Sequence, residues 1–348
     1  MSAAPAGSSL RLAIIGSQGF THVGDSLRTA ALAAGHDVTF FDVGEAYRGS
    51  GLARALAWRA SHRPVALERF SARVADALVE ARPDLVITTG AGGLSRRALD
   101  RLAAGGVVTA NYSTDDPWNP AMSARWHLQA LPAYRHVFTP RRANLEDFRR
   151  AGCADVAYLP FGYDPRHAAP PSPGAPAAAA HEVLFVGGAD SDRVGFLREM
   201  ASGGVAATVV GLYWERYGDL KARSLGVRTP EQLRALTAAA SVNLCLVRRA
   251  NRDGHVMRSL EIAAIGGCML AEDTAEHREL FGPEGEAVLY FASPAGAAEK
   301  ARRLIADADL RRRLAGALHA RIVAGDHTYR DRLEAMIAAV RDARPVAA

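Results

Sequence analysis

Short β-branched or aromatic runs alternate along this chain with stretches of helical period that are rich in alanine, leucine and arginine. This alternation is typical of βαβ units, in which helices flank a buried parallel sheet. The runs of the first half are Leu12 to Ile15, Val38 to Phe41, Leu85 to Thr88, Val107 to Ala110, His136 to Thr139 and Val156 to Leu159. They predict one Rossmann-like domain over residues 1–165.

The alternation stops and then restarts. Residues 166–180 are rich in proline and alanine, which resist strand pairing and a stable packed helix, so they predict a linker. The later runs are Glu182 to Val186, Ala207 to Val210, Val242 to Leu246, Cys268 to Leu270 and Val288 to Tyr290. They predict a second Rossmann-like domain over residues 181–327. The expected fold class is α/β, with two such domains facing each other across a cleft at the carboxyl ends of their strands, where open sheets bind ligands.

Composition excludes several classes of protein. A chain of 348 residues with 49% hydrophobic residues can bury a sizeable core, so disorder is not expected. No run approaches the roughly 20 apolar residues of a membrane span, and Met1 to Ser9 lacks the basic region of a secretory signal, which together predict a cytoplasmic protein. Cys153, Cys245 and Cys268 show no CxxC spacing, so neither a disulfide nor a zinc site is indicated.

The net charge of +5 comes from 42 basic and 37 acidic residues. The basic residues are scattered, without a dense cluster or interleaved aromatics, so a nucleic-acid partner is not indicated. Only Lys221 and Lys300 are lysines, and the P-loop pattern GxxxxGK[ST] is absent. Arginine or backbone amides must therefore meet any bound phosphate.

The most informative segment is NRDGHVMRSLEIAAIGGCML, from Asn251 to Leu270. Its pattern predicts a loop and then a helix from about Val256 to Ile265, stopped by two glycines. Gly254 and His255 precede the amino end of this helix, where unpaired backbone N–H groups and the positive end of the helix dipole suit a diphosphate. We therefore expect these loop residues to contact a phosphorylated ligand.

Arg258 and Glu261 are three residues apart and so share one face of that helix. There a cation can meet phosphate while a carboxylate accepts hydrogen bonds from sugar hydroxyls. Asp253, eight positions before Glu261, could reach the same ligand from the loop. The spacing fits a surface ion pair beside an ordinary glycine cap equally well, so the residues alone leave both interpretations open.

The segment resembles the donor-binding element of GT-B glycosyltransferases related to family 4. The signature of that element is an acidic residue, seven residues, and a glutamate at the head of a small-residue helix that ends in glycine. Asp253 stands at the first acidic position, where the family usually has glutamate, and Glu261 stands at the second. The resemblance implies that Glu261 holds the ribose hydroxyls of a nucleotide-sugar and that Asp253 contacts the sugar.

The chain is more similar still to the spore-maturation-type (CgeB-like) branch of these enzymes, from about Val107 to Arg332. The matching pieces follow the family's order: ANYSTDDPW, HVFTPRRANLEDFRRAGCADVAYLPFGYDP, VLFVGGADSDRVGFL, MRSLEIAAIGG, LFGPEGEAVLYF and HTYRDR. The resemblance implies the GT-B fold, a UDP- or GDP-sugar donor, and a final helix within residues 328–348 that packs back on the first domain.

Five more residues are assigned to the donor side. The resemblance implies that Gly187 and Gly188 let the first strand of the second domain turn tightly beside the ligand, with Arg193 near the diphosphate. A plain glycine turn with a solvated arginine stays open as the alternative. Tyr213 and Trp214 follow a strand and offer rings on which a nucleobase could stack, although one of the two is expected to pack in the core.

Candidates for acceptor chemistry lie in the first domain. The glycine-rich loop GSQGFTHVGD follows the first strand but does not match the GxGxxG fingerprint, so an NAD-dependent oxidoreductase is only a minor alternative. His22 in this loop could contact the donor sugar or deprotonate an acceptor hydroxyl, although a lone histidine is more often structural. Asp115 and Asp116 follow a strand, where one can face the acceptor while the other caps a helix.

These features predict a glycosyltransferase that moves a sugar from a nucleotide-sugar to the hydroxyl of a small molecule, a saccharide or another acceptor. We expect no cofactor and no metal, because Arg258, Arg193 and the helix amino end can stabilise the departing diphosphate. Likeness to the retaining enzymes favours retention of the anomeric configuration. The alternatives are a nucleotide-sugar epimerase or hydrolase on the same fold, and a non-catalytic nucleotide-binding module.

Overall fold

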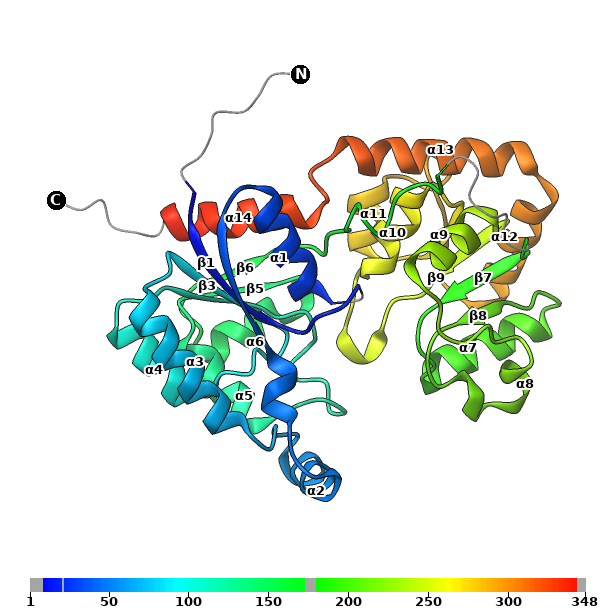
Figure 1. The fold of residues 1–348 in the computed structure, drawn as a ribbon. Helices are drawn as coiled ribbons and strands as arrows, with labels where there is room; N and C mark the ends of the chain where they lie inside the picture. The colour runs from blue at the N-terminus through cyan, green and yellow to red at the C-terminus, as the bar shows by residue number, and fades with distance from the viewer. Residues whose placement is uncertain (1–8, 21, 173–179, 343–348) are drawn as a thin grey trace. The chain divides into compact units, whose positions relative to one another are not determined.

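The structure is a computed structural model that describes residues 9–20, 22–172 and 180–342. The chain forms two compact units (Figure 1). The first unit comprises Met1–Pro160, Ala250–Arg252 and Tyr329–Ala348, and the second comprises Phe161–Arg249 and Asp253–Thr328. A three-residue piece of the loop before the donor-type helix therefore belongs to the first unit.

The first unit is built on a six-stranded parallel sheet with the order β2-β1-β3-β4-β5-β6. Its strands are β1 (Arg11–Gly16), β2 (Asp37–Asp42), β3 (Leu85–Thr89), β4 (Thr109–Tyr112), β5 (His136–Thr139) and β6 (Val156–Tyr158). Each predicted run of the first half forms a strand, because apolar β-branched runs of this length can pair with neighbours on both edges and bury both faces.

Helices cover the two faces of this sheet (Figure 1). The helices of the first unit are α1 (Val23–Ala33), α2 (Gly51–Ser61), α3 (Leu67–Ala81), α4 (Arg96–Ala104), α5 (Arg125–Ala130), α6 (Leu145–Arg150) and α14 (Tyr329–Asp342), with 3-10 turns η1 (Val43–Tyr47), η2 (Leu131–Ala133) and η3 (Arg142–Asn144), and all of them except α2 have buried residues or pack on the sheet. On one face, Phe70 of α3, Leu99 of α4 and Phe148 of α6 share a core with Ile15 and Val86. On the other face, α14 packs against α1.

The second unit is built on a five-stranded parallel sheet with the order β11-β10-β9-β7-β8. Its strands are β7 (Val183–Val186), β8 (Thr208–Val210), β9 (Val242–Cys245), β10 (Met269–Glu272) and β11 (Leu289–Phe291). Its helices are α7 (Ser191–Ser202), α8 (Gly218–Lys221), α9 (Pro230–Ala239), α10 (Met257–Ile265), α11 (Ala275–Phe281), α12 (Pro294–Ala306) and α13 (Ala308–Ala324), with 3-10 turns η4 (Trp214–Arg216) and η5 (Arg249–Asn251). The α/β class with parallel sheets is confirmed.

Strand side chains of the second unit alternate between two cores, as the pleat requires. Leu244 and Leu270 pack in the core that includes α7 and α12, whereas Cys245 and Met269 pack in the core that includes α10. The long helix α13 contributes to both cores. None of the described helices is long and apolar enough to cross a membrane.

The second unit begins before the predicted linker. Phe161, Tyr163 and Ala168 are buried in its core, and the Tyr163 N–H donates to the His327 carbonyl at 2.9 Å. Residues 173–179 of the predicted linker lie outside the described residues. The final helix begins at Tyr329 and belongs to the first unit.

Each strand order reverses at one place, between β1 and β3 in the first unit and between β7 and β9 in the second. Loops that leave neighbouring strands at such a switch point diverge to opposite faces of the sheet and open a crevice for ligands. The sequence candidates follow these strands: His22 comes after β1, Gly187 and Gly188 after β7, and Asp253 after β9. The topology therefore selects the same loops that the sequence patterns indicate.

Candidate functional site

The loops after β7 and β8 approach each other so closely that position 211, after β8, requires glycine. The Gly187 N–H donates to the Val210 carbonyl at 2.8 Å, and the indole Nε1 of Trp214 donates to the Gly187 carbonyl at 2.8 Å. A Cβ atom on Gly211 would lie 2.3 Å from that carbonyl oxygen, and the φ of Gly211 is +138°. Backbone N–H and C=O groups are thus brought close together beside the switch point.

The structure corrects the expectation that Trp214 stacks on a nucleobase. Its side chain is fully buried and packs edge-on against Phe185, with ring centroids 5.9 Å apart. Of the pair, Trp214 is the core residue. Tyr213 is 45% exposed and has a φ of +73°, which is uncommon for an aromatic residue, and the Arg216 guanidinium lies 4.3 Å from its ring centroid. Tyr213 keeps a ring face that a base could contact.

Arg193 stands in the first turn of α7, where Asp190 holds it. The backbone N–H of Arg193 donates to Asp190 Oδ1 at 2.9 Å, and its Nη1 donates to the Gly188 carbonyl at 3.0 Å. The side chain is 14% exposed, so it is not solvated. Burial lowers the pKa of Arg193, and the charge of Asp190 opposes that effect. A guanidinium fixed beside a glycine turn is a preorganised ligand for phosphate.

Arg258 and Glu261 form an ion pair on α10, with Nη1 and Oε2 2.8 Å apart and side chains 22% and 19% exposed. The N-cap residue of this described helix is Val256, whose apolar side chain accepts no hydrogen bond from the N–H groups of the first turn. Burial raises the pKa of the Cys245 thiol to about 11, and the positive charges of Arg258 and Arg193 act against it. Arg193 and Arg258 lie in the first turns of α7 and α10, which follow the neighbouring strands β7 and β9, so a diphosphate bound at this switch point could meet both guanidinium groups.

The loop before α10 approaches the rest of the second unit closely. Asp253 is buried, and its N–H faces the Arg248 carbonyl at 3.3 Å. The charge of Asp253 also acts on Arg193, which places these two residues near each other. A Cβ atom on Gly254 would lie 2.4 Å from Cδ of the buried Glu276, so position 254 requires glycine. Packing alone accounts for Gly254.

His255 has a structural position rather than the ligand contact that the sequence suggests. It is fully buried; its Nε2 accepts the Phe161 N–H at 3.0 Å, and its Nδ1 lies 2.7 Å from Glu276 Oε2. Because a backbone N–H can only donate, Nδ1 carries the imidazole proton and donates to the carboxylate. His255 thus stabilises the loop before α10 through its hydrogen bonds to Phe161 and Glu276.

A second buried histidine supports the start of α10. Ser259 Oγ accepts the Val256 N–H at 3.2 Å and lies 2.8 Å from His277 Nε2, while His277 Nδ1 lies 2.7 Å from the Glu272 carbonyl. The carbonyl must accept, so Nδ1 carries the proton and Nε2 accepts from the serine hydroxyl. Burial lowers the pKa of His277 to about 4, in keeping with a neutral ring.

Acid should destabilise the second unit through His277. Above about pH 6.5 the imidazole is neutral in both the folded and the unfolded chain, but below it only the unfolded chain takes up a proton. Stability is therefore fully present above about pH 6.5 and is lost as pH falls toward 4, by roughly 3 kcal/mol. We expect His277→Gln to flatten this loss in calorimetric scans between these pH values.

A histidine of the first unit supplies the control for that experiment. Burial lowers the pKa of His127 to about 4 as well. In the His277→Gln protein, the acid sensitivity of the first unit should therefore persist, and His127→Gln should remove it. An unchanged acid profile of the second unit in His277→Gln would contradict the assignment.

The sequence patterns did not single out Glu272, at the end of β10. Its carboxylate accepts the Val247 N–H at 3.1 Å and pairs with Arg249 at 3.0 Å. Glu272, Arg249 and Arg193 line a pocket of about 340 Å³ beside the first turn of α7. That volume lies at the lower end of ligand pockets. The only sequence signal for Glu272 is its position just after the predicted strand Cys268 to Leu270.

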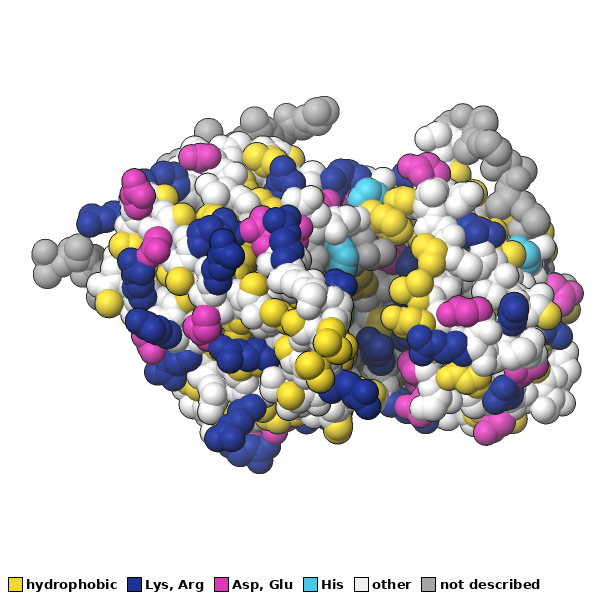
Figure 2. Space-filling model, turned by 60° about the horizontal axis from the view of Figure 1, so that its bottom comes forward, with side chains coloured by type: hydrophobic (Ala, Val, Ile, Leu, Met, Phe, Trp, Pro, Cys, Tyr) yellow, Lys and Arg dark blue, Asp and Glu magenta, His cyan; other side chains and the backbone are white. Residues whose placement is uncertain are grey.

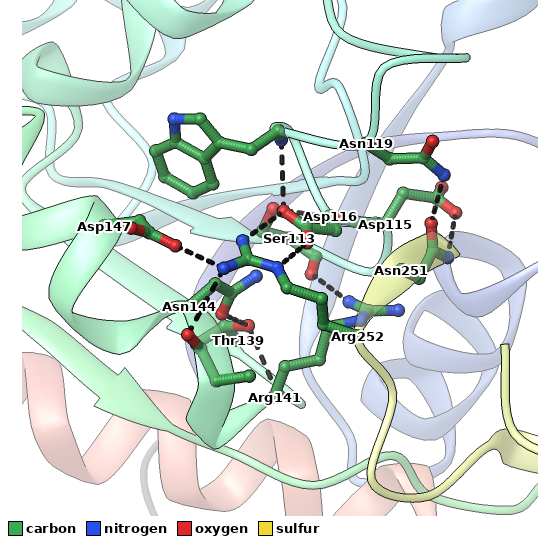
Figure 3. A network of polar contacts seen from close by, with 12 residues as sticks. Ser113, Asp115, Asp116, Asn119, Thr139, Arg141, Asn144, Asp147, Asn251 and Arg252 are labelled. Carbon is green, nitrogen blue, oxygen red and sulfur yellow. Dashed lines mark hydrogen bonds and ion pairs between the residues drawn. The ribbon is translucent and has the colours of Figure 1, made fainter. Parts of the chain in front are cut away.

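In the first unit, the two adjacent aspartates have different surroundings (Figure 3). Asp116 is 1% exposed; its oxygens accept from Arg252 Nε at 2.6 Å and Nη2 at 3.0 Å, and from the Trp118 N–H at 3.0 Å. Asp115 is exposed, and Asn251 Nδ2 lies 3.4 Å from its Oδ1. Asp116 is an anchor for Arg252, which corrects its assignment as a catalytic group. His22 is exposed at the amino end of α1.

The loop after β4 and residues 250–252 form one polar network (Figure 3). Buried Arg141 donates to the Thr114 carbonyl at 2.7 Å and to the Ser113 carbonyl at 3.3 Å. Asn119 Nδ2 donates to Asn251 Oδ1 at 2.7 Å. Arg252 also pairs with Asp147 at 2.6 Å; burial alone would raise the pKa of Asp147, but the hydrogen bonds from Arg252 and Arg150 outweigh it and lower the pKa.

Removing Arg252 should release this loop. Arg252→Met leaves the buried carboxylate of Asp116 without its two guanidinium hydrogen bonds, each of the charged kind. We expect trypsin to cleave after Arg248 and Arg249 roughly tenfold faster, and Asp116→Asn to act in the same direction. Arg150→Met is the control, because Arg150 also pairs with Asp147 but is 68% exposed. Equal cleavage rates of the Arg252→Met protein and the wild type would contradict the role of Asp116 and Arg252 in holding this loop.

Three solved structures resemble the whole chain. Sucrose-phosphate synthase from Thermosynechococcus elongatus is 15% identical with a TM-score of 0.69, over 95% of this chain and 98% of that one. HepE of Anabaena in complex with UDP is 15% identical with a TM-score of 0.63, over 96% and 100%. The third is a UDP-N-acetylglucosamine 2-epimerase from Listeria monocytogenes, described as putative, which is 10% identical with a TM-score of 0.59, over 96% of each chain. The chain has the GT-B fold.

A family model described as glycosyl transferase-like matches residues 193–338 of this GT-B chain. The match covers Arg193, Asp253, Arg258 and Glu261. No curated protein sequence matches the chain. In the part of the chain that the structure describes, no group of three or more histidine, cysteine or acidic side chains is arranged to hold a metal ion.

Proposed function

We propose that this GT-B chain transfers a sugar from a nucleotide-sugar to an acceptor hydroxyl. The observation that carries the proposal is the position of Arg193, Arg258 and Glu261 on α7 and α10, the helices that follow the switch-point strands β7 and β9, within the residues that match the glycosyl transferase-like model. Two arginines supply charge for a diphosphate and a half-buried carboxylate supplies acceptors for ribose hydroxyls. UDP in HepE, which has the same fold, supports this class of ligand.

The residues of the second unit would divide the work as follows. Arg193 and Arg258, with the amino end of α10, hold the diphosphate, while Glu261 holds the ribose and Asp253 the sugar. Because Arg258 pairs with Glu261 at 2.8 Å, it holds that carboxylate in place before the ligand binds. As the bond between the anomeric carbon and the diphosphate oxygen breaks, negative charge grows on that oxygen, and the two arginines stabilise it.

The acceptor hydroxyl oxygen forms the new bond to the anomeric carbon. Its proton passes to a base, for which the exposed side chains of His22 and Asp115 are the candidates, since Asp116 is committed to Arg252. Transfer without a metal ion and with retention of configuration completes the proposal. The arginine charges supply the leaving-group stabilisation that a metal ion would otherwise provide.

A nucleotide-sugar epimerase or hydrolase is the second candidate, favoured by the likeness to the UDP-N-acetylglucosamine 2-epimerase. That enzyme would consume the donor without a hydroxyl acceptor, and its product would carry no new glycosidic bond. Product analysis therefore separates the two activities.

The test is a panel of nucleoside diphosphates and their sugars. We expect one nucleotide class to raise the melting temperature by stabilising the folded second unit. With the matching sugar donor, released nucleoside diphosphate should increase on adding saccharide or small-molecule acceptors, and mass spectrometry should find the glycosylated acceptor. Turnover unaffected by any acceptor would favour the epimerase or hydrolase. Binding without turnover would favour a non-catalytic module, and no nucleotide response would overturn the proposal.

A further inference from the structure

Helix α2 of the first unit has no buried face. None of its eleven described residues is buried, and Leu52 and Leu56 are 72% and 60% exposed. Leu52, Leu56 and Arg59 follow the i, i+4, i+7 spacing of one helix face. In Figure 1 the helix projects from the lower end of its unit. A stable helix in water normally buries one face, so the exposed leucines of α2 indicate a surface that binds a partner.

The helix is fixed at its ends. Ser50 caps the first turn through its hydroxyl, which accepts the Ala53 N–H at 3.2 Å. At the other end His62 adopts a φ of +50°, its Nδ1 lies 2.7 Å from the Ser123 carbonyl, and its own carbonyl accepts from Trp126 Nε1 at 3.1 Å. The exposed face is therefore held in place by the fold rather than left by a frayed end.

The charge around α2 is of one sign. Residues 46–67 contain Arg48, Arg54, Arg59 and Arg63 and no acidic residue. Arg63 pairs with Glu68 at 2.6 Å, whereas among the described residues no carboxylate pairs with Arg48, Arg54 or Arg59. On the view in Figure 2, hydrophobic and basic side chains lie next to one another on this unit.

A pocket of about 380 Å³ lies beside the helix, lined by the rings of Tyr47 and Trp58, by Val65, and by Arg54 and Arg63. Aromatic rings beside cationic groups suit the boundary between an apolar phase and phosphate head groups. A second copy of this chain fits poorly, because a twofold contact through α2 would set the same unpaired arginines against each other.

We infer that α2 docks the protein on an anionic lipid surface, with Leu52 and Leu56 inserted among the acyl chains and the arginines at the head-group phosphates. Exposed leucines beside tryptophan and unpaired arginines, on a helix that the fold holds in place, are the features of an interfacial helix. The inference stands apart from the proposed transferase activity, since no residue of α2 belongs to the donor or acceptor candidates.

The test is co-sedimentation of the full chain with vesicles. We expect binding to vesicles of phosphatidylglycerol and phosphatidylcholine in equal parts, little binding to phosphatidylcholine alone, and release by high salt. Leu52→Gln with Leu56→Gln should weaken binding roughly a hundredfold, because two leucines no longer leave water. Arg54→Gln with Arg59→Gln should weaken it roughly 30-fold, at about fivefold for each arginine. Glutamine keeps the helix propensity.

Matched controls change the same residue types elsewhere. Leu32 and Val323 are 50% and 49% exposed, and Arg97 and Arg303 are exposed arginines away from α2. Leu32→Gln with Val323→Gln, and Arg97→Gln with Arg303→Gln, should leave vesicle binding unchanged. Absence of binding by the wild type, or equal binding by the leucine variant, would overturn the inference. So would a dimer in sedimentation velocity that the leucine variant abolishes, since α2 would then serve contact between copies.

Discussion

Glu261→Ala should reduce nucleotide affinity and sugar turnover by roughly a hundredfold or more while the fold survives. A carboxylate that accepts two ribose hydroxyls contributes about 1.5–3 kcal/mol for each hydrogen bond, and no other acidic residue of α10 can take its place. The side chain is 19% exposed and its partner Arg258 is 22% exposed, so its loss should shift the melting temperature by only a few degrees. Isothermal titration with the responding nucleotide and turnover with its sugar donor measure the effect.

The matched control is Glu286→Ala. Glu286 also pairs with an arginine of the second unit, Arg321 at 3.5 Å, but it precedes the amino end of β11, at the opposite edge of the sheet from the switch-point loops. The Glu286→Ala protein should bind and turn over the donor like the wild type. Near-normal turnover in Glu261→Ala would remove the donor assignment, even if the protein still bound a nucleotide elsewhere.

His255→Leu should lower the melting temperature of the second unit by roughly 6–20 °C. The change leaves the Glu276 carboxylate, whose side chain is 7% exposed, without its imidazole partner and leaves the buried Phe161 N–H without an acceptor. Loss of the charge-assisted hydrogen bond to the buried carboxylate and of the acceptor for the Phe161 N–H together costs about 3–5 kcal/mol. Differential scanning calorimetry resolves the two units if they melt separately.

A double variant tests the cause. Glu276→Gln in the His255→Leu background removes the buried charge that has lost its imidazole donor and should recover part of the lost stability. His319→Leu is the control, since His319 lies in the same unit and bonds one carbonyl, Ala263 at 3.1 Å, without a carboxylate. If His319→Leu lowers the melting temperature as much as His255→Leu, the cause is the loss of imidazole packing and not the loss of the hydrogen bond to the Glu276 carboxylate.

The sheets could be predicted because their signal is local. The run His136 to Thr139 was predicted and forms β5 with the same bounds, since β-branched and aromatic residues pack well on the pleated surface of a sheet. The start of α9 has a local signal too, because Thr229 precedes Pro230 at the first helical position and Gln232 completes a capping box. The prediction that Arg193 and Arg258 share one ligand also rests on strand ends and helix starts, and the structure places both residues in helices that follow the switch-point strands; the shared ligand stays a prediction.

The direction of side chains in the loops could not be predicted in the same way. His255 and Trp214 stand at positions that a ligand would approach, yet the first pairs with Glu276 and the second packs on Phe185. The partner of Asp116 is 136 residues away in sequence, and no local pattern records such a pairing. Those contacts form only when the tertiary fold brings distant residues together. They determine whether a side chain in these loops supports the fold or is available to contact a ligand.

The return of α14 to the first unit sets an order on biosynthesis. Leu333 and Met336 of this helix are fully buried, and α14 packs on α1. The ribosome therefore completes every residue of the second unit before it supplies the helix that closes over α1. Until then a nascent first unit carries an open apolar flank, so chaperone occupancy should persist through translation of the second unit and end only when residues 329–342 emerge from the exit tunnel.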